Sequence, residues 1–314
     1  LTLNRTRFFT FKGKNATGNP WYHNIGLNYT MSVKNQISVP DSVLGAIFRN
    51  PTGNVTIQEV NNGDTSLVSR PSLGFFNNGI GHVIPISTQL NVAKYITLQP
   101  SFNFKEYWYF KTRDYSYHPD SRKVGYTERP GFASARDFNF SLSTSTRIYG
   151  LFGGGGKKQT TVRHTVTPNL GYTFRPDFSE SRWGFYQEIQ VDSTGKTDRL
   201  NRFAGGIQGS PPKGEQQEVS FGINNMLELK YRTKISEGDT TTKKDPFTRL
   251  TLLDAFAVNG RYNFAAADSL YFSPFSFIAR TNFLNNKFNF VVNGSLDPYA
   301  VNGQGRRIPT YRYE

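Results

Sequence analysis

The clearest pattern in the chain is the strict alternation of residue types over residues 162–175. One set of alternating positions is apolar or aromatic apart from a single histidine: Val162, His164, Val166, Pro168, Leu170, Tyr172 and Phe174. The positions between them are small or polar, with arginine at both ends. A period of two predicts a strand whose two faces meet different environments. Its length exceeds the usual about five or six residues and suits a tilted strand that crosses a bilayer, which needs about 9–11.

The same alternation recurs along most of the chain. It is found over residues 25–34, 96–105, 138–148, 219–231, 256–264, 275–284 and 288–292. We find no helical period of useful length. The pattern predicts an all-β fold, an antiparallel transmembrane β-barrel to which this chain contributes roughly ten to twelve long strands of a larger barrel. Residues 1–314 are expected to form part of one such domain, as an internal piece of a longer chain.

Two polar stretches lack the alternation and are predicted to be loops. The first is a long loop near residues 40–78, rich in Gly, Asn, Pro and Ser. The second covers residues 114–134 and contains two prolines. A long loop is uncommon in a compact domain and points to exposure or function.

Composition agrees with a barrel without proving one. The chain has 36% hydrophobic and 15% aromatic residues, a mean hydropathy of -0.53 and a net charge of +14. A barrel wall reads as polar overall because every second residue faces the lumen. The positive charge favours anionic partners, although it does not choose among nucleic acid, anionic lipid and phosphorylated saccharide. There are no cysteines, so disulfides and thiolate chemistry are excluded.

The polar faces of the predicted strands carry several basic side chains. If these faces line a lumen, they make it electropositive and suited to an anionic amphiphile. The candidate ligand-contacting residues are Lys105, Asn139, Arg147, Arg163, Arg175 and Lys230. The alternative is a solvated face that holds no specific ligand.

Catalytic and metal-binding signatures are weak. The four histidines lack metal-ligand spacing, and we expect His164 to bond to a neighbour rather than to a metal. The glycine-rich run Gly153–Lys158 resembles a phosphate loop, but Leu151 stands where that motif needs glycine. We therefore predict neither an enzyme nor a bound cofactor.

Several stretches resemble one known family. The run RHTVTPNLGYTFRPDFS (residues 163–179) is similar to part of the barrel of LptD, the lipopolysaccharide-assembly protein. HVIPISTQL, FNFKEYWYFKTR, FGINNMLELK and SLDPYAVNGQGRRI look like a divergent branch of that family. The resemblance covers most of the chain from about Gly79 onward.

The resemblance implies a very large outer-membrane barrel that inserts lipopolysaccharide into the outer leaflet. The implied partners are an LptE-like lipoprotein plug, lipopolysaccharide, the periplasmic Lpt bridge components and outer-membrane lipid, with no nucleic acid. The implied activity is translocation, without bond chemistry. The cysteines that pair in some relatives are absent, so a disulfide-controlled assembly step is not expected. Two other functions stay open: a passive porin-like channel, and a soluble basic β-sandwich that binds an anionic polymer.

Overall fold

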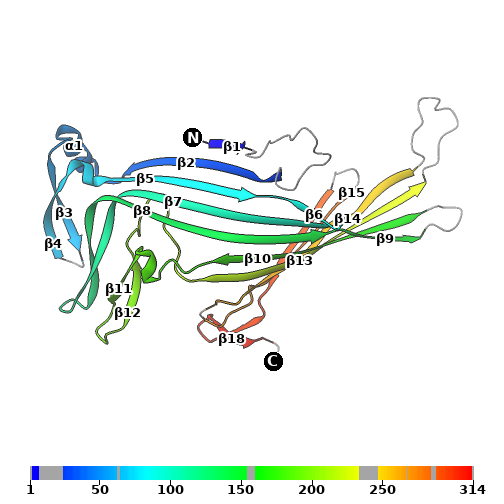
Figure 1. Cartoon of the computed structure of the whole chain (residues 1–314). Coiled ribbons are helices and arrows are strands. Elements are labelled where there is room, and N and C mark those ends of the chain that lie inside the picture. The colour runs from blue at the N-terminus through cyan, green and yellow to red at the C-terminus, as the bar shows by residue number, and fades with distance from the viewer. Residues whose placement is uncertain are drawn as a thin grey trace.

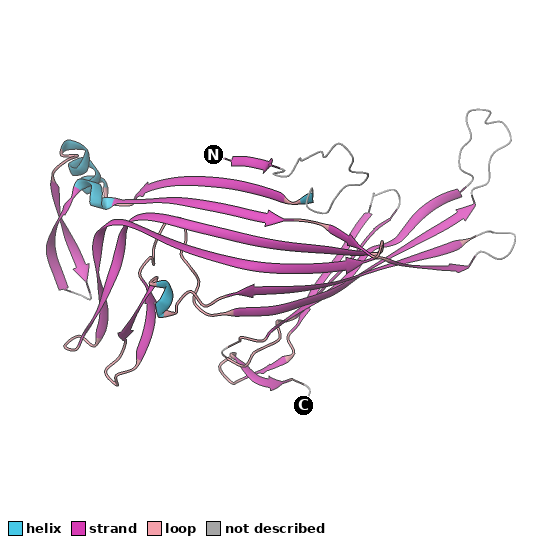
Figure 2. Ribbon diagram, viewed as in Figure 1, coloured by secondary structure: helices cyan, strands magenta, loops and turns pink. Residues whose placement is uncertain are grey.

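The computed structural model describes residues 2–6, 24–61, 64–153, 160–232, 247–266, 268–283 and 288–312. Strands dominate this part of the chain (Figure 2). Twelve of them form one antiparallel sheet. Its main path runs in the order β1 (Thr2–Thr6), β2 (Gly26–Ile37), β5 (Phe76–Ser87), β7 (Ile96–His118), β8 (Lys123–Thr146), β10 (Thr161–Arg175), β13 (Gln216–Arg232), β14 (Phe247–Asn263), β15 (Phe275–Phe283) and β16 (Phe288–Leu296). The short strands β6 (Leu90–Val92) and β9 (Ile148–Gly153) pair with β7 and β10.

The long strands run side by side along the molecule (Figure 1). At one end lie the tip of the β7–β8 hairpin and five smaller elements: α1 (Asp41–Arg49), β3 (Asn54–Asn61), β4 (Asp64–Pro71), β11 (Tyr186–Gln190) and β12 (Thr197–Asn201). None of the described helices has both the length and the apolar character needed to cross a membrane.

The alternation in the sequence becomes a sheet with two unlike faces. The pairing register places apolar residues opposite apolar residues and polar residues opposite polar ones. Leu170 of β10 lies opposite Phe221 of β13, and Thr173 lies opposite Ser141 of β8. We call the two sides the apolar face and the polar face. The apolar face is uncovered, because Leu170 is 50% exposed and Phe290 of β16 is 59% exposed. The all-β, antiparallel fold is confirmed.

The β-sandwich alternative is not supported by this architecture. A sandwich buries the inner faces of two sheets against each other. In the part of the chain that the structure describes, the three other sheets have only two strands each. None of them is large enough to cover the apolar face.

Strand β10 contains two exceptions to its pattern, and both have local explanations. On the apolar face, His164 Nε2 lies 3.1 Å from Asn225 Oδ1 of β13, so two polar side chains satisfy each other. This agrees with the predicted neighbour-bonded histidine. Near Pro168, which has no N–H to donate, β10 changes its neighbour from β9 to β8, whereas pairing with β13 continues without a shift.

The predicted loop over residues 114–134 is wrong, because β7 and β8 continue through it as a hairpin. Beyond Phe110 the apolar alternation ends, and cross-strand pairs hold the hairpin instead. Lys111 Nζ donates to Glu128 at 3.1 Å, and the Arg113 guanidinium lies 4.1 Å from the ring centre of Tyr126. Thr112, Asp114 and Ser116 occupy the positions that were apolar before Phe110, so the apolar period on which the sequence prediction depends is lost.

The predicted long loop near residues 40–78 is also wrong in its local structure. It contains the helix α1 (Asp41–Arg49), the hairpin β3 (Asn54–Asn61) and β4 (Asp64–Pro71), and the 3-10 turn η2 (Ser72–Phe75). Helix α1 has an acidic first turn and a basic last turn, which suits the helix dipole. Elements this short lack enough repeats to show a reliable period.

The connection between β10 and β13 forms the main buried core. It contains the turn η3 (Ser181–Trp183) and the hairpin β11 (Tyr186–Gln190) and β12 (Thr197–Asn201). Phe178, Phe185 and Phe203 from this connection pack against Tyr107 and Tyr109 of β7. A last hairpin, β17 (Tyr299–Val301) and β18 (Arg307–Tyr311), follows β16.

Candidate lumen-facing site

The polar face carries a pocket that unites three of the six predicted ligand residues. Lys105 of β7, Asn139 of β8 and Arg175 at the end of β10 line it together. They converge because each occupies a polar-face position on one of three adjacent strands. The other lining residues are Tyr107, Asp137, Ser210, Pro212 and Gln216. We call this the lumen pocket, after the prediction that the polar face lines a lumen.

Positive charge in the lumen pocket is only partly compensated. Arg175 Nη2 donates to the carbonyl oxygen of Gly214 at 3.1 Å, while its buried Nε has no hydrogen-bond partner. Lys105 is exposed and forms no ion pair within the described part of the chain. Asp137, the only carboxylate in the lining, is buried and accepts a hydrogen bond from the Tyr107 hydroxyl at 2.7 Å. The pocket can therefore offer donors to an anionic or polyhydroxylated ligand.

One wall of the pocket comes from a segment that crosses the polar face. Residues 203–214, which we call the strap, leave β12 and run over β7, β5 and β2 before β13 begins. Gln208 carries the attachment, because its Nε2 donates to the carbonyl oxygens of Ser32 at 2.8 Å and Gly79 at 2.9 Å. Its backbone N–H also donates to the Tyr109 hydroxyl at 3.1 Å.

The strap lies close to the sheet because glycines remove side chains where it passes. A Cβ on Gly79 of β5 would lie 3.0 Å from Gln208 Cγ and 2.9 Å from the Tyr109 ring. A Cβ on Gly206 of the strap would lie 2.5 Å from Tyr109 Cζ. Tyr109 is buried and cannot give way easily. Neither contact is compatible with a larger residue unless the strap moves.

A carboxylate fixes the other end of the strap. Asp177 Oδ1 accepts hydrogen bonds from the backbone N–H groups of Ser179 and Gly214, both at 2.8 Å. Partial burial acts to raise the pKa of Asp177, but the hydrogen bonds from Ser179 and Gly214 and the nearby Arg199 charge outweigh it. The result is a pKa below the ordinary aspartate value. The ionised carboxylate is therefore part of the folded strap.

The other predicted ligand residues lie elsewhere. Arg163 Nε donates to Glu228 of β13 at 2.6 Å, so its charge is compensated. Lys230 lies over the ring of Phe247, 4.4 Å from its centre. Arg147 does not continue the strand face expected over residues 138–148, because β8 ends at Thr146 and Arg147 is exposed in the break before β9. The structure does not bring these three into the lumen pocket.

Sequence reasoning missed Gln208, Ser210, Gln216 and the Tyr107–Asp137 pair. Gln208 bonds to carbonyl groups 176 and 129 positions away in the chain, and no local pattern encodes such contacts. The pair of adjacent glycines at 205 and 206 was the available signal, because it marks a place where the backbone comes close to another group. Within the described residues, no three His, Cys, Asp or Glu side chains gather as a metal site would need.

Comparison with known proteins identifies a family. No curated protein and no solved structure matches the chain. A family model described as LptD protein matches residues 1–299, so the match also includes the residues before Gly79, where the quoted stretches begin. The suspected resemblance is confirmed. Because the match covers almost the whole sequence, the chain belongs to the LptD protein family.

Proposed function

We propose that this chain is a wall segment of an outer-membrane translocon that inserts lipopolysaccharide into the outer leaflet. Family membership indicates a component of lipopolysaccharide transport. The finer proposal is an LptD/LptE-type device. Its partners would be an LptE-like lipoprotein plug, the periplasmic Lpt bridge components, lipopolysaccharide and outer-membrane lipid.

The carrying observation is the contrast between the two faces of the sheet. Lipopolysaccharide has acyl chains and a phosphorylated saccharide, which need opposite surroundings. The exposed apolar face suits lipid, because apolar side chains there would otherwise meet water. The lumen pocket places the exposed amine of Lys105 and the positive charge of Arg175 where anionic sugar groups would lie. The protein would move the molecule without making or breaking a covalent bond.

Photo-crosslinking from two neighbouring residues tests this proposal. Asn139 lies on the polar face and Phe140 on the apolar face, so a photoreactive amino acid at each position samples opposite sides of one strand. In cells we expect a lipopolysaccharide adduct from position 139, on the face where the saccharide would pass. Position 140 samples the acyl chains and membrane lipid on the other face. The absence of an adduct at position 139 would contradict the proposal.

Charge reversal sharpens the test. Lys105→Glu combined with Arg175→Glu should reduce the adduct at position 139, because both side chains line the same pocket. Arg182→Glu is the matched control, since Arg182 is exposed and paired with Glu180 outside the pocket. An unchanged adduct in the double variant would show that lipopolysaccharide does not contact the lumen pocket.

The alternative function is a passive porin-like channel, and the strap is the feature that distinguishes it from a translocon. An open channel needs a clear polar face, whereas here the strap crosses it. Steady ion conductance through the purified protein, without any lipopolysaccharide adduct, would favour the porin.

A further inference from the structure

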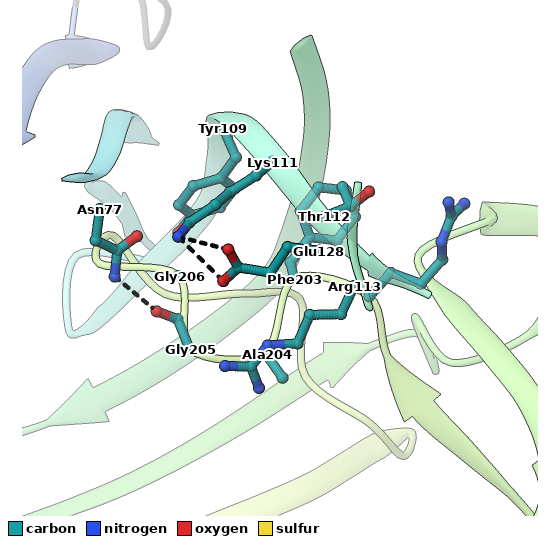
Figure 3. A pocket seen from close by; sticks show the side chains of 11 residues that line it. Asn77, Tyr109, Lys111, Thr112, Arg113, Glu128, Phe203, Ala204, Gly205 and Gly206 are labelled. Carbon is teal, nitrogen blue, oxygen red and sulfur yellow. Dashed lines mark hydrogen bonds and ion pairs between the residues drawn. The ribbon is translucent and has the colours of Figure 1, made fainter. Parts of the chain in front are cut away.

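A second pocket lies on the same face of β7, on the other side of the strap. Along β7 the side chains of Lys105, Tyr107, Tyr109, Lys111 and Arg113 alternate onto the polar face. Tyr107 lines the lumen pocket, and Tyr109 lines the second one. Figure 3 shows this second pocket between β7, Glu128 of β8 and the strap residues Phe203–Gly206. We call it the outer pocket.

Positive charge exceeds negative charge in the lining of the outer pocket. Lys111, Arg113 and Arg202 line it, against the single carboxylate of Glu128. Lys111 Nζ binds both oxygens of Glu128, at 3.1 and 3.2 Å. Arg202 Nη2 donates to Asp114 at 3.1 Å.

Arg113 is the cation without a carboxylate partner. Within the described part of the chain it forms no ion pair. Its guanidinium carbon lies 4.1 Å from the centre of the Tyr126 ring, and its Nη2 lies close to Gly205 of the strap. Stacking on a ring occupies the flat side of a guanidinium and leaves the N–H groups at its edge available. Arg113 is half-buried, and none of its guanidinium nitrogens is both fully buried and unpaired, so its donors stay within reach of a ligand in the pocket.

We propose that the outer pocket binds one anionic group, a phosphate monoester or a carboxylate, with Arg113 as the principal ligand. A guanidinium edge binds such groups through two parallel hydrogen bonds. The cavity measures about 60 Å³. That is room for on the order of four water molecules, which suits one phosphate group better than a sugar ring. Glu128 competes with the ligand for Lys111, so binding transfers the lysine from the carboxylate to the anion.

The origin of the ligand rests on the proposed function. An anionic saccharide that has passed the lumen pocket would meet the outer pocket next, beyond the strap. The two pockets then form successive sites on one strand face, Lys105 with Arg175 on one side and Arg113 with Lys111 on the other.

Titration calorimetry on the full chain in detergent micelles at low salt tests the site. The probes are glucose 6-phosphate, glucuronate, inorganic phosphate and uncharged glucose. We expect glucose 6-phosphate or glucuronate to bind and glucose to give no heat. Arg113→Gln should weaken binding at least tenfold. Arg182→Gln is the control, because Arg182 also lies over an aromatic ring, 5.2 Å from the centre of Trp183, but outside the pocket.

A variant that is expected to bind the probe more tightly distinguishes loss of the site from misfolding. Glu128→Gln removes the competing carboxylate and frees Lys111, so binding should tighten several-fold. A damaged protein would not bind more tightly. Equal affinity in the wild type and Arg113→Gln, or binding of glucose as strong as that of glucose 6-phosphate, overturns the proposal. Inorganic phosphate that binds as well as glucose 6-phosphate supports an anion site and assigns it to free phosphate.

The two proposals can fail separately. If position 139 crosslinks to lipopolysaccharide but no anionic probe binds, only the outer pocket is rejected. If a probe binds through Arg113 but position 139 gives no adduct, the anion site stands and the transport proposal is rejected.

Discussion

The sheet and the connection between β10 and β13, residues 176–215, are stabilised in different ways. Strand β10 is specified by a period, with a paired neighbour for almost every residue. The connection is specified by single contacts, such as Gln208 on two carbonyl groups and Phe178 at 0% exposure. A periodic wall spreads its stabilisation over many similar pairs, whereas the connection concentrates it in a few side chains. Substitutions should therefore have small effects in the wall and large effects in the connection.

The largest effect is expected from Phe178→Ala. The Phe178 ring contacts Phe138 and Trp183, with centroid distances of 5.4 and 5.1 Å, and it is fully buried. Its loss leaves a cavity, which should lower the free energy of unfolding by about 3–5 kcal/mol. Urea titration in detergent micelles measures this. A loss below about 1 kcal/mol would show that the aromatic cluster does not hold the connection.

Gly206→Ala should have the next largest effect. The new methyl group would lie 2.5 Å from Tyr109 Cζ, so the strap must move away from β7. We expect a loss of about 1–3 kcal/mol and faster protease cleavage within residues 203–214. Gly303→Ala is the matched control, because a Cβ there meets nothing within 4 Å. Identical cleavage rates in the two variants would mean that the strap is not pressed against the strand.

Leu170→Ala tests the wall side of the comparison. Leu170 is half exposed, and it pairs with Phe221 and Thr144 across the sheet. A cross-strand pair contributes about 0.2–1 kcal/mol, so the same urea titration should show a loss in that range. A loss as large as that of Phe178→Ala would break the distinction between the two regions.

The smallest expected effect is the loss of stability at acid pH when the Asp177 carboxylate becomes protonated. The pKa of Asp177 is lowered in the folded protein, so the stability it contributes is present above its unfolded pKa of about 3.9 and is lost as pH falls through the folded pKa. The midpoint of unfolding should therefore drop more between pH 5 and pH 3 in the wild type than in Asp177→Asn. Parallel curves for the two proteins would show that Asp177 does not anchor the strap.

The same division explains what could be predicted from the sequence. The alternation of β10 predicted its position and both its faces. The same pattern in β7 and β8 placed Lys105 and Asn139 on the polar face together with Arg175. It could not reveal that Glu228 compensates Arg163, because that partner is set by the register with β13. Nor could it reveal the β7–β8 hairpin beyond Phe110, where Thr112, Asp114 and Ser116 occupy the positions that were apolar before it.

The strap has a mechanical consequence for the sheet. Through Gln208 it joins the carbonyl groups of β2 and β5 to Tyr109 of β7, and through Gly214 it joins Asp177 at the end of β10. Flattening or tightening the curvature of the sheet changes the separation of these strands, so it stretches or compresses the strap. The strap therefore stiffens the part of the wall that it crosses, and the wall can bend more easily toward the far ends of the same strands.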